Sequence, residues 1–196
     1  MLAFFIKVYK LKTFSYKIYC SYMMFKRFIP FAHAQSIYEI ETDFFKRNGV
    51  KTLFIDLDNT LDSYKATEPK ERTINKVNSL KDAGITPVII SNNKAHRVSG
   101  YANKLGVEFL PSARKPFSKK IKNEIARRGL SNDEVMLVGD QMMTDVLAAR
   151  GARIRVVLTE KVVKEDQWTT HINRIFDRPI RRYHRKRGNL KDWRNK

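Results

Sequence analysis

Short apolar runs alternate with amphipathic stretches along the middle of the chain. The runs are apolar almost throughout, which predicts strands buried on both faces of a parallel sheet, at Thr52–Asp56, Thr86–Ile90, Val107–Leu110, Val135–Val138 and Ile154–Leu158. Between them, apolar residues recur at helical spacing up to a glycine, which predicts helices at Pro69–Ala83, Ala95–Leu105, Phe117–Arg128 and Asp145–Arg150. We therefore predict an α/β fold with a five-stranded parallel sheet and helices on both faces.

The excess of positive charge is concentrated at the two ends of the chain. The 196 residues include 39 Lys and Arg against 20 Asp and Glu, which gives a net charge of +19. Residues 1–30 hold six basic residues and no acid, and residues 172–196 hold ten basic residues and two acids. This excess indicates a polyanionic partner, such as nucleic acid, an anionic membrane surface or a phosphorylated substrate. The alternative is that both ends are solvated tails that keep the protein soluble.

The sequence divides into three parts. Residues 24–165 contain the predicted strands and helices and form the expected domain, and residues 166–196 form a basic amphipathic tail. Residues 1–23 are a basic, aromatic leader of unknown role, without the apolar length of a membrane span or the layout of a secretory signal. They are either an amphipathic segment that lies on a membrane or sequence upstream of a natural start at Met23 or Met24.

Cysteine and histidine are scarce. The single cysteine, Cys20, excludes an internal disulfide framework and a cysteine-based zinc site. Four scattered histidines argue against a histidine-rich metal site. We therefore expect a cytoplasmic protein, in peripheral contact with the inner face of the membrane if the basic tail binds lipid.

Polar residues follow the ends of the predicted strands. In chain order they are Asp56 and Asp58, Ser91 and Asn92, Lys115, and Asp140 and Asp145. Ligands of open parallel sheets bind beyond the carboxyl ends of the strands, near the switch in strand order. We therefore expect these side chains to gather at a single edge of the sheet.

This set of side chains suits phosphoryl transfer. Several carboxylates at one edge repel one another unless a divalent cation lies among them, and oxygen-only ligands favour Mg²⁺. The ammonium of Lys115 and the hydroxyl of Ser91 can hold a phosphate. Asp56 and Asp58 lie two residues apart, so in a strand both face the same side, where one can attack phosphorus while the other handles the leaving-group proton.

Each of these residues also has an ordinary structural interpretation. Asp58 lies in a stretch that suits a turn with a helix cap, and Ser91 or Asp145 can cap the helix that follows it. Lys115 can be one more surface lysine in a lysine-rich chain. Their succession at the ends of consecutive strands favours a shared site over these separate explanations.

The same residues lie in four sequence motifs. The stretches FIDLDNTL around Asp56, ISNN around Ser91, ARKP around Lys115 and VGDQMMTDV around Asp140 resemble, in order, the four motifs of the haloacid dehalogenase superfamily. They are most similar to the YqeG-like phosphatases of its subclass IIIA. The resemblance covers about residues 50–160 and implies a Rossmannoid core. Members of this superfamily that have a cap domain insert it after the first or the second motif. The gaps between these motifs are too short here for such an insertion, so we expect no cap domain.

The resemblance implies a role for each site residue. Asp56 would be the nucleophile that forms an aspartyl-phosphate, and Asp58 the general acid and then the base that activates water. Ser91 and Lys115 would bind the transferring phosphoryl group. From its place beside Ser91 we also count Asn92 among the phosphate-binding residues, although Asn92, Asn93 and Arg114 are weaker candidates for substrate contact. The implied magnesium ligands are Asp56, the backbone carbonyl of Asp58, and Asp140, with Asp145 supporting the metal or orienting Lys115.

The resemblance also suggests a substrate. YqeG-like proteins are similar to phosphatases that act on phosphatidylglycerophosphate, which implies a lipid phosphate here. A capless, open site suits a bulky substrate or one held at an interface. The alternatives are a phosphatase for soluble or macromolecular phosphoesters, and an RNA- or ribosome-associated binding protein with little turnover.

The C-terminal tail fits either a membrane or RNA. Apolar residues in Trp168–Arg187 recur at roughly helical spacing among many arginines, although Pro179 is expected to break or bend the helix. A basic amphipathic segment suits an anionic membrane and would bring the site to a lipid head group. The same arginines would suit RNA phosphates, but no RNA-binding motif is present. The sequence identifies neither the physiological substrate nor the oligomeric state.

Overall fold

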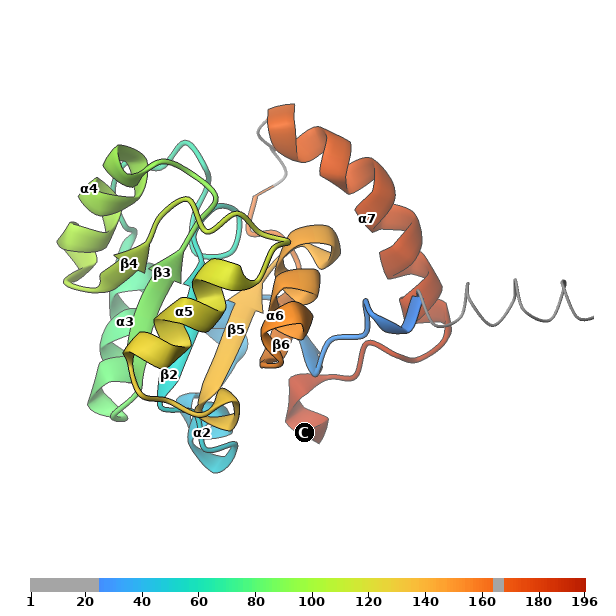
Figure 1. The fold of residues 1–196 in the computed structure, drawn as a ribbon, viewed down its shortest axis with the longest axis horizontal. Coiled ribbons are helices and arrows are strands. Elements are labelled where there is room, and N and C mark those ends of the chain that lie inside the picture. The colour runs from blue at the N-terminus through green and yellow to red at the C-terminus, as the bar shows by residue number, and fades with distance from the viewer. Residues whose placement is uncertain (1–24, 164–167) are drawn as a thin grey trace, which may run out of the picture.

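The computed structural model describes residues 25–163 and 168–196. It contains a six-stranded, fully parallel sheet in the order β1-β6-β5-β2-β3-β4 (Figure 1). The strands are β1 (Ala32–Ala34), β2 (Thr52–Asp56), β3 (Thr86–Ile90), β4 (Glu108–Leu110), β5 (Val135–Gly139) and β6 (Arg155–Thr159). The strand order reverses beside β2, which has β3 on one side and β5 on the other. Asp56 therefore ends a central strand at the position where α/β sheets bind ligands.

Five of these strands confirm the sequence prediction, and the sixth corrects it. β1 pairs in parallel with β6 at the edge of the sheet, with His33 opposite Leu158. The strand has only three residues, Ala-His-Ala, and so lacks the length and apolar periodicity that identify a strand from sequence. Its pairing depends on β6, which lies more than a hundred residues further along the chain.

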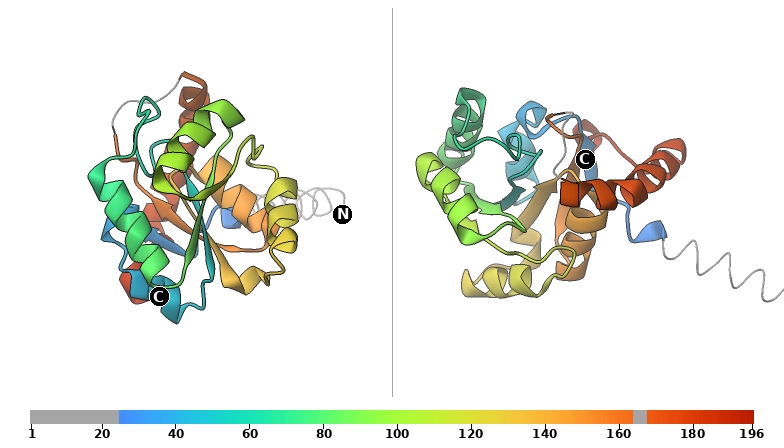
Figure 2. Two further views of the ribbon diagram at one scale, coloured as in Figure 1. Left: turned by 90° about the vertical axis from the view of Figure 1, so that its left-hand side faces the viewer. Right: turned by 90° about the horizontal axis from the view of Figure 1, so that it is seen from above.

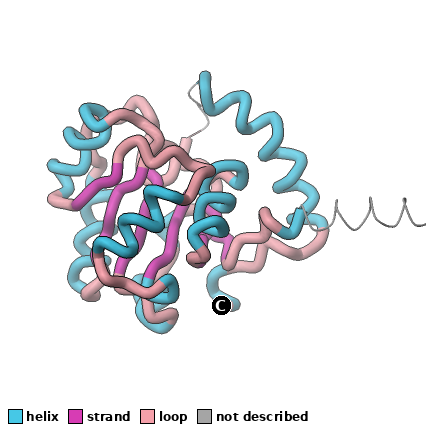
Figure 3. The backbone as a smooth tube through the Cα atoms, in the orientation of Figure 1, coloured by secondary structure: helices cyan, strands magenta, loops and turns pink. Residues whose placement is uncertain are grey.

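Helices cover both faces of the sheet, as predicted (Figures 1 and 3). The helices are α2 (Thr42–Arg47), α3 (Glu71–Asp82), α4 (Ala95–Leu105), α5 (Lys119–Arg127), α6 (Leu147–Ala152) and α7 (Trp168–Lys186), with short turns η1 (Ile37–Glu39), η2 (Asn132–Glu134) and η4 (Trp193–Asn195). The predicted helix at Asp145–Arg150 begins earlier, in a π-helical turn, η3 (Met142–Val146), that leads into α6. Loops 57–70 and 91–94 leave no room for a cap domain.

The core consists of two apolar layers, one on each face of the sheet. Alternate residues of β2 point to opposite faces, as strand geometry requires. Leu53 and Ile55 belong to the layer that includes α2, α3 and α4. Phe54 belongs to the layer that includes α5 and α6, and Ile180 of α7 packs against the same layer.

The C-terminal residues fold back onto the domain. Helix α7 projects from the side of the molecule that carries α6 (Figure 2). It continues through Pro179, so of the two outcomes expected at this proline, a break or a bend, the break does not occur. Because Pro179 is exposed, water can satisfy the backbone carbonyl one turn earlier. Beyond α7, Trp193 is buried with its ring edge-to-face against Phe44, 5.7 Å between centroids.

The three-part division of the sequence stays a prediction. Its leader, residues 1–23, lies outside the described residues. Within the described ranges, none of the helices combines the length and apolar character needed to cross a bilayer.

Candidate active site

The chain turns sharply after β2, and the buried carboxylate of Asp62 holds this turn in place. Asp56 is buried, and beyond it Asn59 adopts a left-handed φ of 65°, a conformation that asparagine tolerates. The N–H of Asn59 donates to the carbonyl of Asp62 at 2.7 Å, which closes the turn. The Asp62 carboxylate is buried and accepts hydrogen bonds from the hydroxyls of Tyr101 (2.6 Å) and Thr73 (2.9 Å). Asp62 thus ties the loop after Asp56 to α3 and α4.

Lys115 reaches the site from the loop after β4. Its backbone is held by the side chain of Asn92, which donates to the Lys115 carbonyl (2.9 Å) and accepts from the Lys115 N–H (2.7 Å). The bond between Lys115 and Pro116 is cis. The ammonium of Lys115 donates to Oδ1 of Asp56 at 2.5 Å and to Oδ1 of Asp145 at 2.7 Å. Lys115 therefore joins the end of β2 to the segment after β5, and is 6% exposed.

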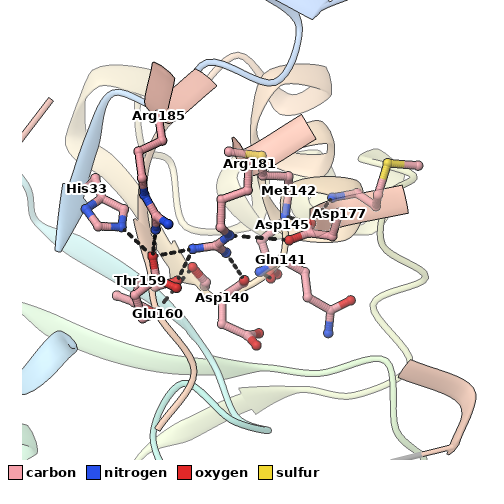
Figure 4. Close-up of polar contacts among 12 residues, drawn as sticks. His33, Asp140, Gln141, Met142, Asp145, Thr159, Glu160, Asp177, Arg181 and Arg185 are labelled. Atoms are coloured by element: carbon pink, nitrogen blue, oxygen red, sulfur yellow. Dashed lines mark hydrogen bonds and ion pairs between the residues drawn. The ribbon is translucent and has the colours of Figure 1, made fainter. Parts of the chain in front are cut away.

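Asp140 and Asp145 follow β5 (Figure 4). Oδ2 of Asp145 accepts from the backbone N–H of Gln141 at 3.1 Å, so both oxygens of Asp145 have partners within the protein. The approach is so close that a Cβ added to Gly139 would lie 2.3 Å from Cγ of Asp145. Only glycine fits at this position while Asp145 keeps its place.

The carboxylates of this edge fit a hard divalent cation. Asp56, Asp140 and Asp145 each place a carboxylate oxygen within 4.8 Å of the others, and all three residues are buried. Lys115 contacts two of the three and can balance only one negative charge. A buried, oxygen-only donor set with excess negative charge matches the preference of Mg²⁺. The contacts of Asp145 with Lys115 and Gln141, and its place in this group, are compatible with both of its predicted roles, support of the metal and orientation of Lys115.

Burial and crowding shift the ionisation of this cluster. Burial raises the pKa of Asp56 well above its usual range, the charges of Asp145 and Asp140 raise it further, and Lys115 opposes them. Burial lowers the pKa of Lys115, but the carboxylates of Asp145 and Asp56 outweigh burial and raise it, so the ammonium stays charged. A cation bound among the carboxylates would favour the ionised form of Asp56 that a nucleophile requires.

Asp58 lies beside this cluster, in a separate set of hydrogen bonds. Its Oδ2 accepts from Nδ2 of Asn93 at 2.7 Å and from the hydroxyl of Ser91 at 3.4 Å, and its Oδ1 lies 3.5 Å from Nη2 of Arg97. Burial raises the pKa of Asp58, against the opposing effects of Arg97 and the hydrogen bond from Asn93. A carboxyl group with a raised pKa retains its proton closer to neutral pH, which suits a general acid.

The structure brings most of the predicted site residues together. Asp56, Lys115 and Asp145 are in direct contact, Asp140 is adjacent, and Asp58 shares a hydrogen bond with Ser91. Asn92 differs, because its amide is used on the backbone of Lys115 rather than directed to a ligand. Arg114 is exposed, with a left-handed φ of 59°. The roles assigned to all these residues stay predictions.

Sequence reasoning missed four residues that support the site. They are Asp62, which holds the loop after β2, Arg97 beside Asp58, and Asp177 and Arg181 on α7. Asp62 and Arg97 are ordinary polar residues in the sequence, with no motif to mark them. Asp177 carries one signal, since it is one of only two acids in a strongly basic segment.

Comparisons with known proteins show which proteins this chain is similar to. A curated relative, the probable phosphatase YqeG of Bacillus subtilis (strain 168), is 30% identical over 168 residues, which cover 86% of this chain and 98% of that protein. Similar solved structures include an uncharacterized protein from Listeria monocytogenes serotype 4b, at 12% identity and a TM-score of 0.48 over 60% of this chain and 85% of that one. Another is the 3-deoxy-D-manno-octulosonate 8-phosphate phosphatase of Moraxella catarrhalis, in complex with magnesium, phosphate and KDO, at 16% identity and a TM-score of 0.42 over 52% of this chain and 64% of that one.

A family model assigns the chain. The model of the haloacid dehalogenase-like hydrolases matches residues 4–159, a range that includes every residue of the acidic cluster and Lys115. The chain therefore belongs to the haloacid dehalogenase-like hydrolases.

Proposed function

We propose that this hydrolase is a magnesium-dependent phosphatase that cleaves a phosphomonoester through an aspartyl-phosphate on Asp56. The observation behind the proposal is the contact of Asp56 with Lys115 inside a buried group of three carboxylates. A cation, a carboxylate nucleophile and a lysine at one site are the components of phosphoryl transfer. The relative from Bacillus subtilis, which is named a probable phosphatase, supports the same activity.

In the first step, a carboxylate oxygen of Asp56 attacks phosphorus and the ester P–O bond breaks. Asp58, with its raised pKa, gives its proton to the departing alkoxide oxygen. Lys115 and the Ser91 hydroxyl hold the transferring phosphoryl oxygens. The products of this step are the free alcohol and a phosphoryl group bonded to Asp56.

In the second step, the carboxylate of Asp58 takes a proton from water as that water attacks phosphorus. The bond between phosphorus and the Asp56 oxygen breaks, which releases inorganic phosphate and restores the carboxylate. The hydrogen bond from Asn93 and the nearby guanidinium of Arg97 keep Asp58 in place for both proton transfers. Asp58 ends the cycle protonated, as it began.

Mg²⁺ would be held by the Asp56 carboxylate, the backbone carbonyl of Asp58 and the Asp140 carboxylate. When bound, the ion supplies charge stabilisation to the phosphoryl oxygens. Asp145 keeps Lys115 directed at Asp56, so that one ammonium serves both the nucleophile and the phosphate.

The favoured substrate is a lipid phosphate of the phosphatidylglycerophosphate type. Ile175 and Phe176 of α7 are 65% and 58% exposed, and Arg178 and Arg182 lie exposed on the same helix. Apolar and basic side chains exposed side by side suit the head-group region of an anionic membrane. Among the described residues no domain is inserted as a lid over the site, so a substrate held in a membrane surface could reach it.

The test is phosphate release from phosphatidylglycerophosphate in mixed micelles, with Mg²⁺ or EDTA, by the wild-type protein and Asp56→Asn. We expect release that requires Mg²⁺ and is lost in the variant. Turnover of an aryl phosphate alone would retain the phosphatase and reject the lipid. If neither substrate is turned over, the binding-protein alternative replaces the enzyme.

Membrane contact has its own measurement, partition into phosphatidylcholine vesicles that contain phosphatidylglycerol. Arg178→Ala and Arg182→Ala should each weaken partition roughly fivefold, since a basic residue near an anionic surface contributes about 1 kcal/mol. Lys119→Ala and Lys122→Ala on α5 remove the same charge elsewhere and serve as matched controls. If Arg178→Ala and Arg182→Ala weaken RNA binding but leave vesicle partition unchanged, these two arginines bind RNA and the proposed membrane contact is wrong.

A further inference from the structure

Helix α7 contacts the segment that carries Asp140, through two charged residues one helical turn apart (Figure 4). Asp177 is buried, and its Oδ1 accepts hydrogen bonds from the backbone N–H groups of Met142 (2.5 Å) and Met143 (3.2 Å). These amides begin η3, where a helix leaves its first N–H groups without partners in its own backbone. Asp177 supplies the missing acceptor from a different element.

Arg181 holds the other side of the same segment. Its Nη2 donates to the carbonyl of Asp140 at 2.6 Å, and its Nη1 donates to the carbonyl of Thr159 at 3.2 Å. Its Nε lies 3.5 Å from Oδ2 of Asp177, and its Nη1 lies 3.0 Å from Oε1 of Glu160. The planar guanidinium thus connects the ends of β5 and β6 in a way that a single ammonium could not reproduce.

The contacts of Arg181 and Asp177 hold the backbone at Asp140 and just after it. Arg181 binds the carbonyl of Asp140 itself, and Asp177 binds the amides two and three residues later. With the backbone held before and after the turn, the direction of the Asp140 carboxylate is restricted. Groups that orient a metal ligand in this way contribute to metal affinity without touching the metal.

Other residues also attach α7 to the domain, so the need to attach this helix does not by itself explain why Asp177 and Arg181 are charged. Ile180 packs against the core, His184 is buried, and Tyr183 stacks on Phe25 with 4.8 Å between ring centroids. An apolar helix face would attach α7 without placing a carboxylate in a buried position and a guanidinium in a part-buried one, with side chains 3% and 11% exposed. Buried charged groups are costly unless each is paired, as both are here.

We propose that Asp177 and Arg181 are positioning residues that fix the segment Asp140–Met143, and with it the Asp140 carboxylate, for cation binding. The inference rests on the proposed function in one respect, namely that Asp140 is a magnesium ligand. It assigns to the basic C-terminal segment a role in the site, in addition to any contact with a membrane. It also predicts that metal affinity depends on a helix that holds none of the ligands.

The test compares Arg181→Ala, Arg181→Lys and Asp177→Asn with the matched control Arg185→Ala. Arg185 lies one turn from Arg181 on the same helix and contacts the same Glu160 oxygen at 2.8 Å, but it does not contact the Asp140 segment in any described hydrogen bond. Calorimetric titration with Mg²⁺ alone, in the absence of substrate, gives the affinity of each protein. We expect about 10- to 100-fold weaker binding in Arg181→Ala and less than twofold change in the control.

A second measurement needs neither metal nor activity. Amide hydrogen exchange at Met142 and Met143 should be at least about tenfold faster in Arg181→Lys and Asp177→Asn, with β2 and β5 unchanged. In kinetics, the Mg²⁺ concentration for half-maximal rate should rise more than the KM for substrate. Arg181→Lys retains a cation for Glu160 and Asp177, so it is the variant to use if Arg181→Ala does not fold.

Two results would overturn the proposal. One is Mg²⁺ affinity that falls equally in Arg181→Ala and Arg185→Ala, since that is the signature of general loosening of α7. The other is unchanged exchange at Met142 and Met143 in the folded variants. If the wild-type protein binds no Mg²⁺, the proposed cofactor is wrong, and amide exchange alone then decides whether the pair holds the segment.

Discussion

At the residue scale, the site depends on close contacts between residues that are separated along the sequence. Gly139 is a clear case, because its missing side chain makes room for a carboxylate six residues further on. Asn92 is another, since its amide forms a pair of hydrogen bonds with the backbone of Lys115. Neither residue needs to touch substrate in order to be required for the geometry of the lysine and the carboxylates.

Gly139→Ala should therefore disable the site. The new Cβ would lie 2.3 Å from Cγ of Asp145, a distance at which one group must move, and Asp145 is fully buried. We expect activity to fall at least about tenfold and stability to fall by about 1–3 kcal/mol, as in other overpacked cores. The measurements are turnover of an aryl phosphate and urea denaturation.

The matched control is Gly100→Ala. Gly100 is exposed in α4, and apart from its chain neighbours and the backbone of its own helix no atom lies within 4 Å of the position that a Cβ would take. Alanine in a helix interior is favoured over glycine by roughly 0.5–1 kcal/mol, so this variant should be slightly more stable and fully active. Equal activity in the two variants would show that Asp145 can move aside without harm.

At the element scale, the edge of the sheet is joined to α7 through Glu160, just beyond β6. Oε1 of Glu160 lies 3.0 Å from Nε2 of His33, 3.0 Å from Nη1 of Arg181 and 2.8 Å from Nη2 of Arg185 (Figure 4). The hydrogen bond with His33 lowers the pKa of Glu160, burial opposes it, and the charge of Arg181 adds to it, to give about 2. One carboxylate thus joins β1, β6 and α7.

Glu160→Gln should cost about 1–2 kcal/mol of unfolding free energy at pH 7, the range for hydrogen bonds to a charged group at a partly exposed site. The folded pKa, about 2, lies below the ordinary value of 4.5, so the ionised carboxylate stabilises the folded state. Its contribution is fully present above about pH 4.5 and is lost as the pH falls toward 2. The difference between wild type and variant should narrow over that window in urea denaturation.

Glu108→Gln is the comparison for this prediction. Glu108 also pairs with two arginines, Arg127 and Arg128, but its side chain is 56% exposed. Exposed ion pairs contribute about 0–1 kcal/mol, so this variant should differ little from wild type at any pH. A pH-independent loss in Glu160→Gln would indicate altered packing rather than a lost charge interaction.

At the scale of the whole molecule, the buried carboxylates should link stability to metal. The proposed Mg²⁺ site includes Asp56 and Asp140, whose carboxylates come together only in the folded state, so the unfolded chain has no such site. A ligand at a hundredfold excess over its Kd stabilises by about 2.7 kcal/mol, so the Tm of metal-free protein should rise by several degrees when Mg²⁺ is added. Differential scanning calorimetry measures the rise.

Asp140→Asn should abolish most of the rise, because it removes one ligand. Asp133→Asn is the matched control, since Asp133 is an exposed acid near the opposite end of β5. A Tm that rises equally in all three proteins would place the bound cation elsewhere and contradict the proposed ligand set.

The strands β2 to β6, the helices between them and the edge at which the site lies are all predictable from the pattern of residues along the chain. Apolar runs separated by amphipathic stretches form a parallel sheet through helical crossovers, and because the strands run in the same direction their carboxyl ends lie at one edge. Asp56, Lys115 and Asp140 are therefore neighbours for reasons that are visible along the chain. The sixth strand was missed, because three small residues carry no periodic signal.

The contacts between side chains at that edge, and the residues that hold them, could not be predicted from the sequence and are seen only in the folded structure. Asn92 hydrogen-bonds the Lys115 backbone, Asp145 hydrogen-bonds the Lys115 ammonium, and Asp177 and Arg181 bind a segment more than thirty residues earlier. Such contacts depend on side-chain directions and on packing between distant elements, and both are set by the whole core. The local sequence pattern therefore predicts where the site lies, while packing between distant elements determines the orientation of its side chains.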